Sequence, residues 1–238
     1  MATLGATGIS DAVQDYAKAI YSLQERFEEP VSTSALAERL AVSPASASAM
    51  VKRLESLGLV KRELYHGVEL TPAGARVALE VIRHHRLLEL YLAEALDMSW
   101  DRVHEEAEVL EHAISPELSE LIARKLGNPT HDPHGDPIPT ADGEIEPGRS
   151  RPLAELEPGV RGTFVRVSDS DPEALRYLSS RGIAPGDAFE VLERQPFEGP
   201  LVVRFDSGDH ALGGALVVMM RVDVDVDVDM DVDVDVHR

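Results

Sequence analysis

Three histidines and three glutamates stand at helical spacing in two neighbouring stretches of the chain. The larger group contains His104, Glu108, Glu111 and His112. With about 100° per residue, these four side chains would fall within an arc of about 100° on one helix face. His85 and Glu89 repeat the i, i+4 spacing on the preceding segment. Facing pairs of this kind build carboxylate–imidazole sites in helical bundles. The pattern therefore predicts a metal site between two helices.

The simpler interpretation makes Glu108 and Glu111 surface charges and the histidines core residues. One such histidine would suit that interpretation, but the repeat on two neighbouring faces favours a site. The chain has no cysteine, which excludes disulfides, thiolate catalysis and sulfur-rich zinc or iron–sulfur sites. Carboxylates and imidazoles suit manganese or ferrous iron, although zinc and cobalt would bind too.

The elements that must position these residues are three predicted helices. They are a long helix from Pro72 through Ala95, a second over Trp100–Ile114 and a third over Pro116–Leu126. A stretch rich in Pro, Gly and Asp follows from Gly127 to Pro152 and predicts a loop.

The segment before the long helix has the pattern of a winged helix-turn-helix. Predicted in order are helices over Asp11–Phe27, from Ser32 through Leu40 and from Pro44 to Gly58, a turn at Ala41–Ser43 and a hairpin over Leu59–Thr71 that turns at His66-Gly67. In this motif the second helix of the pair enters the major groove of DNA and the wing contacts the backbone. The alternative is a helical hairpin used only for packing.

The predicted DNA contacts are small hydroxyl or methyl side chains at the start of the reading helix and basic side chains behind them. They are Ser43, Pro44, Ala45, Ser46, Ser48, Lys52, Arg53, Lys61 and Arg62. The hydroxyl-rich stretch offers no Asn, Gln or Arg for bidentate base recognition, so part of the specificity should come from DNA shape.

The last part of the chain reads as a small five-strand barrel. Its predicted strands include Gly162–Val167, Ala188–Arg194, Leu201–Phe205 and Ala215–Val222, with one helix over Leu175–Arg181. Beyond it, Val or Met alternates with Asp, and we expect a disordered acidic tail rather than a strand, because the Asp side chains would repel one another on a sheet.

The formal net charge of −20 over 238 residues argues at first against a nucleic-acid partner. Seven Asp of the tail supply about a third of that charge, whereas Ser43–Arg62 holds four basic residues against Glu55 alone. DNA affinity depends on this local balance. Neither a long apolar run nor a secretory signal is visible, so we expect a cytoplasmic protein without membrane association.

The chain resembles the diphtheria toxin repressor family, and its manganese transport regulator branch in particular. The likeness covers Ser10 to about Val222. It is most specific in four segments: Asp15–Tyr21, Arg83–Glu89, Val103–His112 and Asp132–Pro139. The resemblance implies a mostly α fold with a small β domain. The domains would be a winged helix-turn-helix (1–75), a helical metal-binding and dimerisation domain (76–146), an SH3-like, FeoA-like barrel (147–222) and the tail (223–238).

The resemblance also implies two metal sites. By position, the primary ligands are Asp15, Glu108, Glu111 and His112, and the ancillary ligands are His85, Glu89 and His104. Iron-type members have Met and Cys where this chain has Asp15 and Glu108, and two hard oxygens fit manganese better.

The chain departs from the family pattern at two places. Lys18 stands where small manganese regulators have an acidic residue, which argues against their close-spaced binuclear arrangement. Among the barrel ligands, Asp171 matches the first position but Ala174 occupies the second, where Glu173 or Asp169 would have to compensate.

The resemblance thus implies a homodimeric, manganese-dependent repressor of metal-uptake genes that is not an enzyme and binds a palindromic DNA operator. Mn²⁺ is the expected ion, Fe²⁺ the alternative, and Co²⁺, Zn²⁺ or Cd²⁺ would substitute in vitro. An iron(II)-dependent regulator on the same scaffold is the nearest alternative function. A metal-dependent hydrolase or a metal-buffering protein is the alternative of another class.

Overall fold

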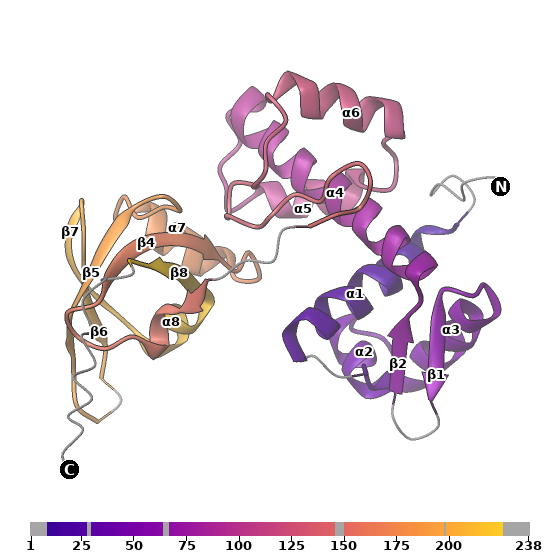
Figure 1. Cartoon of the computed structure of the whole chain (residues 1–238), viewed down its shortest axis with the longest axis horizontal. Coiled ribbons are helices and arrows are strands. Elements are labelled where there is room, and N and C mark those ends of the chain that lie inside the picture. The colour runs from indigo at the N-terminus through magenta and orange to yellow at the C-terminus, as the bar shows by residue number, and fades with distance from the viewer. Residues whose placement is uncertain (1–8, 28–29, 64–66, 146–149, 198, 226–238) are drawn as a thin grey trace, which may run out of the picture. The chain divides into compact units, whose positions relative to one another are not determined.

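The chain folds into two compact units in the computed structural model, which describes residues 9–27, 30–63, 67–145, 150–197 and 199–225. Unit 1 comprises Met1–Asp132 and Pro137–Glu146, and unit 2 comprises Pro133–Asp136 and Pro147–Arg238. Unit 1 is mostly helical and unit 2 is built on a sheet, as Figure 1 shows. Within the described ranges, no helix has both the length and the apolar character that a membrane crossing needs.

Unit 1 begins with the predicted winged helix-turn-helix. Its elements are α1 (Asp11–Phe27), α2 (Thr33–Arg39), α3 (Pro44–Ser56), β1 (Val60–Glu63) and β2 (Gly67–Leu70). Ser32 caps α2 by accepting a hydrogen bond from the Ala35 amide, and Ser43 caps α3 in the same way from Ser46. The hairpin pairs antiparallel, and residues 64–66 at its tip, including the predicted turn residue His66, lie outside the described residues.

Helix α4 (Pro72–Leu96) runs through both halves of unit 1 (Figure 1). Its first turns complete the core of the winged helix-turn-helix, where Val77 and Ala78 pack with Ile20, Leu36 and other residues of α1 to β2. Its later turns carry Leu87, Leu88 and Leu90 into a second core with α5 (Val103–Leu110) and α6 (Pro116–Lys125). One continuous helix therefore joins the two cores.

Hydrogen bonds and close backbone packing connect the start of α4 to the turn between α3 and β1. Thr71 caps α4 and donates its hydroxyl to the Gly58 carbonyl, while the Thr71 amide bonds to the Leu59 carbonyl. Gly74 lies so close to this turn that an added Cβ would stand 2.0 Å from the Leu59 carbonyl oxygen. Only glycine fits here without displacing backbone.

The helix predicted over Trp100–Ile114 is shorter in the structure. It spans Val103–Leu110, so the prediction that Glu111 and His112 lie within the helix is wrong. Glu111 is the C-cap in αR conformation, and the Ala113 amide bonds to the Leu110 carbonyl, which tightens the last turn. Pro116 begins α6 and Ser115 before it is extended, so the chain leaves the helix early to reach this cap.

Unit 2 contains a six-stranded antiparallel sheet in the order β3-β8-β4-β5-β6-β7. The strands are β3 (Arg151–Pro152), β4 (Arg161–Val167), β5 (Ala188–Arg194), β6 (Leu201–Phe205), β7 (Gly208–Leu212) and β8 (Met220–Val224). Short helices occur at η2 (Leu153–Glu155), α7 (Pro172–Ser179) and α8 (Gly214–Met219). Phe164, Val191, Val203 and Val222 are buried between these elements.

The structure corrects the predicted strands of unit 2, where six strands form in place of the expected five. The segment predicted as one strand over Ala215–Val222 is divided between α8 and β8, because β4 offers pairing partners only from Met220 onward. Strand β8 also continues two residues beyond Val222, into the segment that we expected to be the tail, and Val224 pairs with Gly162 of β4. The rest of the tail, from residue 226, lies outside the described residues.

Candidate metal centre and DNA-reading surface

Three of the four predicted primary ligands meet in unit 1. Asp15 on α1 places its Oδ1 2.8 Å from the Nε2 of His112, which lies just beyond α5. The Oε1 of Glu111 is 3.5 Å from the same nitrogen. Ligand atoms of Asp15, Glu111 and His112 all lie within 4.8 Å of one another. The structure thus gathers two carboxylates and an imidazole from segments almost 100 residues apart.

Gln14 fixes which nitrogen of His112 faces this group. The Nδ1 of His112 lies 2.7 Å from the Gln14 Oε1, and the Gln14 amide nitrogen donates to the Ile9 carbonyl at 3.3 Å. With Nδ1 donating to Gln14, Nε2 is left to bind a cation. A ligand histidine that gives its other N–H to a fixed acceptor is the usual arrangement around protein metals.

Glu111 is the central carboxylate of the site. Burial of Glu111 opposes its ionisation, but the hydrogen bond with His85 and the charge of Lys18 outweigh burial and lower the pKa of this carboxyl. Burial raises the pKa of Asp15, although the neighbouring His112 acts in the opposite direction. The site therefore holds one buried carboxyl group with a lowered pKa and one partly exposed carboxyl group with a raised pKa.

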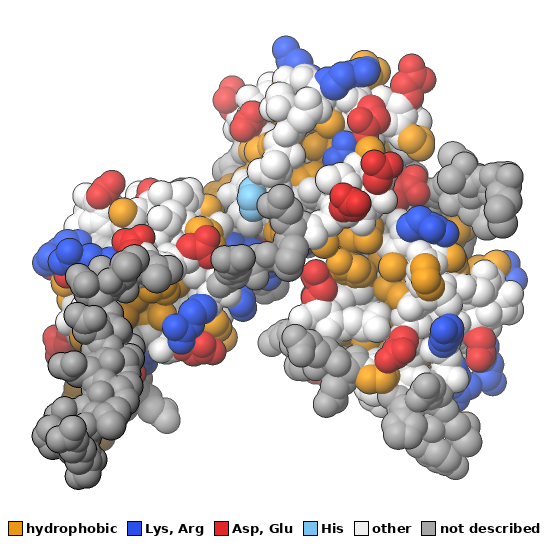
Figure 2. Space-filling view, viewed as in Figure 1, with side chains coloured by type: hydrophobic (Ala, Val, Ile, Leu, Met, Phe, Trp, Pro, Cys, Tyr) orange, Lys and Arg blue, Asp and Glu red, His pale blue; other side chains and the backbone are white. Residues whose placement is uncertain are grey.

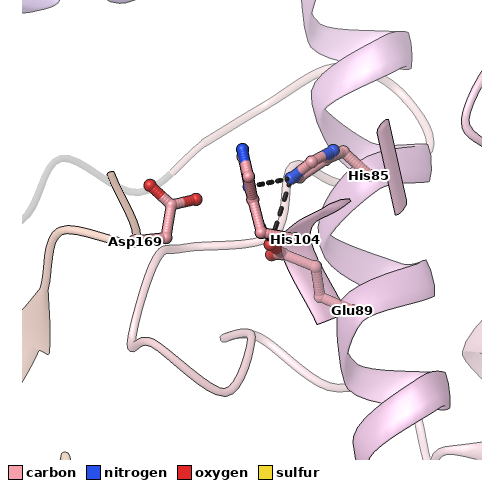
Figure 3. A group of neighbouring side chains, drawn as sticks. All are labelled: His85, Glu89, His104 and Asp169. Atoms are coloured by element: carbon pink, nitrogen blue, oxygen red, sulfur yellow. Dashed lines mark hydrogen bonds and ion pairs between the residues drawn. The ribbon is translucent and has the colours of Figure 1, made fainter. Parts of the chain in front are cut away.

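The predicted ancillary ligands form a second cluster beside the first. Figure 3 shows the His85 ring contacting both Glu89, one turn along α4, and His104 on α5. The His85 Nε2 is 3.1 Å from the Glu89 Oε1 and 3.1 Å from the His104 Nδ1, and the last two atoms are 3.3 Å apart. Burial alone would lower the pKa of His85, but hydrogen bonds with Glu111 and Glu89 outweigh it and raise that pKa.

His85 also links the two clusters. Its Nδ1 lies 2.5 Å from the Glu111 Oε2, while its Nε2 faces Glu89 and His104. Each ring nitrogen thus serves a different cluster, and Glu111 uses one oxygen toward each.

Glu108, the fourth predicted primary ligand, clusters with His85 and Glu111 and is not grouped with Asp15 and His112. Its Oε1 is 2.7 Å from the Nζ of Lys18 and 3.8 Å from the His85 Nδ1. The Lys18 ammonium also lies 2.7 Å from the Glu111 Oε2 and 3.2 Å from the His85 Nδ1. A cation of the chain itself therefore sits in the ligand cluster formed by His85, Glu108 and Glu111.

Asp171, the predicted barrel ligand, is the N-cap of α7 in unit 2. Its Oδ1 accepts hydrogen bonds from the amides of Glu173 and Ala174 at 2.9 and 3.3 Å. Asp169 lies in the turn between β4 and α7. The capping bonds give Asp171 a local structural role within its own unit.

The donor set fits a hard divalent cation. Among the described residues, the buried Oε1 of Glu111 is an oxygen without a hydrogen-bond partner, and it faces the His112 Nε2. A buried carboxylate oxygen without a partner is costly unless a cation compensates it. Oxygen and imidazole donors without sulfur are the ligands that manganese and ferrous iron accept.

The predicted DNA-reading residues lie on the exposed side of α3 and on β1. Ala47, Val51 and Leu54 are buried, whereas Ser46, Ser48, Lys52 and Arg53 on the other side of the helix are exposed, as are Lys61 and Arg62. The Ser43 hydroxyl is used for capping and contacts the Ser46 hydroxyl at 2.8 Å.

The acidic net charge does not produce a uniformly acidic surface. On the face seen in Figure 2, basic and acidic side chains are interspersed over each unit. Local basic groups such as those of α3 are thus compatible with the overall charge.

Sequence reasoning missed two residues of the metal centre. Gln14 immediately precedes Asp15 on α1, and its neutral side chain gives no signal of its own. His84 is buried, with its Nδ1 3.2 Å from the Glu111 carbonyl, and burial lowers its pKa. Its position next to His85 in the sequence was the available signal. Both histidine rings contact Glu111, His84 at the backbone carbonyl and His85 at the side chain.

Three family models cover most of the chain. The N-terminal DNA-binding domain of iron-dependent repressors matches residues 9–68, and their metal-binding and dimerisation domain matches residues 71–140. The FeoA domain matches residues 151–223, which confirms the predicted FeoA-like barrel.

Curated relatives and solved structures agree with these models. The diphtheria toxin repressor of Corynebacterium efficiens is 31% identical over 217 residues, 85% of this chain and 94% of the relative. The iron-dependent repressor of Mycobacterium leprae is 36% identical over 206 residues, 81% of this chain and 88% of the relative. A structure described as a manganese-dependent transcriptional repressor in complex with manganese is 44% identical with a TM-score of 0.83, covering 89% of this chain and 99% of that one.

These likenesses extend over all three predicted domains and place the chain among DNA-binding regulators rather than hydrolases. The chain belongs to the diphtheria toxin repressor family of metal-dependent transcriptional repressors.

Proposed function

We propose that this chain is a manganese-dependent repressor of metal-uptake genes that acts in the cytoplasm as a homodimer on a palindromic operator. Asp15, Glu108, Glu111 and His112 would hold the regulatory ion, and His85, Glu89 and His104 would form an ancillary site. Asp171 stays a prediction from the family pattern.

The observation that carries this proposal is the origin of the ligands. Asp15 comes from α1, in the winged helix-turn-helix, whereas Glu111 and His112 follow α5 in the helical part. A site completed only when these segments meet ties ion binding to the arrangement of the DNA-reading part.

The proposed mechanism depends on the side chains that surround the ion site. A bound divalent ion would supply the positive charge that compensates Asp15 and buried Glu111. Gln14 holds the His112 ring with Nε2 toward the site, and His85 holds the second oxygen of Glu111. If ion binding favours the arrangement that binds DNA, it raises the affinity for the operator. Operator DNA must then raise the affinity for the ion by the same factor.

The choice of manganese is supported by Asp15 and Glu108, which are hard oxygen donors at positions where the family's iron-type members have sulfur. Manganese-dependent repressors are also among the similar solved structures. Iron(II) is the second candidate, because iron-dependent repressors are among the relatives at 36% identity.

Operator binding across a panel of divalent ions tests the proposal. Gel shifts would use the chelator-treated full chain and DNA from upstream of its own gene and of neighbouring transporter genes. We expect Mn²⁺ to give a specific complex, which Co²⁺ and Zn²⁺ would also support in vitro, with Fe²⁺ measured anaerobically in parallel. A complex of equal strength in chelator and in Mn²⁺ would contradict the proposal.

A second prediction concerns Lys52, which is exposed one turn after Ser48 on α3. If it contacts phosphate, Lys52→Gln should weaken specific and non-specific DNA binding alike. The slope of log affinity against log salt should fall by about 0.9 per lost contact, hence about 1.8 for a dimer. The exposed Lys125 at the end of α6 provides the control, since Lys125→Gln should leave the slope unchanged. An unchanged slope for Lys52→Gln would remove this residue from the DNA contacts.

A further inference from the structure

Lys18 occupies a place within the metal centre that no ligand assignment explains. It lies on α1 three residues after Asp15, so both side chains leave the helix on one face. Its ammonium lies 2.7 Å from a carboxylate oxygen of Glu108 and 2.7 Å from one of Glu111. The Lys18 side chain is only 19% exposed, so these contacts are largely removed from water.

These contacts divide the predicted primary ligands into two groups. Asp15, His112 and the Oε1 of Glu111 face one another, whereas Glu108 and the Oε2 of Glu111 face Lys18. The same Oε1 of Glu108 contacts the Lys18 ammonium and faces the His85 Nδ1, so the ammonium lies among groups that a bound ion would use.

We propose that Lys18 is a competing cation built into the metal centre, so that loading the regulatory ion exchanges the Lys18 contacts of Glu108 for coordination. This inference rests on the proposed function. An ammonium and a divalent ion that share Glu111 repel each other, and burial strengthens that repulsion. Both the lost ion pair and the repulsion raise the ion concentration needed for loading.

The exchange predicts opposite effects of Lys18 on the two forms of the protein. Without an ion, Lys18 compensates Glu111, whose side chain is fully buried, and its removal should destabilise the fold. With an ion, the competitor is gone and binding should tighten. A lysine that only stabilised the fold would give no gain in ion affinity.

The test compares the full-length chain with Lys18→Met, which keeps the length of the side chain without its charge. Calorimetric Mn²⁺ titration would follow the binding event that Asp15→Asn removes, and thermal unfolding in chelator would be followed by fluorescence of Trp100, the only tryptophan. We expect Lys18→Met to bind Mn²⁺ about 10-fold more tightly and to unfold at a lower temperature in chelator. Lys125→Met is the matched control, and neither quantity should change.

Lys18→Gln is a second variant for the case that Lys18→Met does not fold, because the glutamine amide can still donate a hydrogen bond to one carboxylate. Equal or weaker Mn²⁺ affinity in the folded Lys18 variants would overturn the inference. If the unaltered chain shows no Asp15-dependent ion binding, the proposed function fails instead. If it binds the ion and its operator normally while the Lys18 variants match it, only the inference fails.

Discussion

Replacing Asp15 with asparagine is expected to abolish the metal-dependent gain in operator affinity. Couplings between ligand sites typically change affinity by about 5- to 150-fold, and this factor should fall to 1 in the variant. The amide keeps the shape of the side chain but loses the charged oxygen that faces His112. Gel shifts in Mn²⁺ and in chelator measure the factor directly.

The fold should survive this change, because the Asp15 side chain is 41% exposed. Circular dichroism and gel filtration would check that the variant is folded and keeps its oligomeric state. Glu25→Gln supplies the control, since Glu25 is an exposed acid of the same helix far from the ligands. If the Asp15→Asn variant gained as much operator affinity in Mn²⁺ as the parent does, α1 would have no part in the metal mechanism.

The second large effect is expected from Gly74→Ala, which adds a methyl group against the turn between α3 and β1. The new Cβ would stand 2.0 Å from the Leu59 carbonyl oxygen and 2.9 Å from a side-chain carbon of Leu70. Because the obstacle is mostly backbone, relief requires moving α4 away from the wing. We expect a loss of about 3 kcal/mol in the free energy of unfolding, measured by urea titration in chelator with far-ultraviolet circular dichroism.

Operator binding by Gly74→Ala should fall as well, even with saturating Mn²⁺, since the hairpin and α3 are fastened to this turn. Gly214→Ala is the control for the same substitution. An added Cβ there meets no atom within 4 Å, so stability should be unchanged or slightly higher. If Gly74→Ala were as stable as the parent, the close approach of Gly74 to the Leu59 carbonyl would not restrict this position to glycine.

The elements with one dominant local signal could be predicted from the sequence. α1 has a strong helical period and its predicted bounds, Asp11–Phe27, are confirmed, as are those of β5 and β6. β7 was missed because its Gly208-Asp209 start has low strand propensity, and it forms by pairing with β6 at the edge of the sheet. α8 is rich in Val and was read as a strand, but its position before β8 overrides that local preference.

The candidate metal centre could be predicted where the spacing of its residues along one segment gave the signal. The separation of Glu108, Glu111 and His112 places them on one side of the chain even though α5 ends at Leu110. The ammonium of Lys18 beside Glu108 was not predictable, because the contact joins residues 90 positions apart. The hydrogen bond between Gln14 and His112 depends on the same packing of α1 and spans 98 positions.

The continuity of α4 through both cores of unit 1 sets a constraint on how such a chain can change in length. At 1.5 Å and about 100° per residue, its 25 residues span about 37 Å, and one inserted residue would turn everything beyond it by about 100°. Asp15 would then be swung away from His112 while each core kept its own packing. Insertions and deletions should therefore be tolerated in the surface loops, whereas the residue count between Val77 and His85 is fixed by the need to bring Asp15 together with Glu111 and His112.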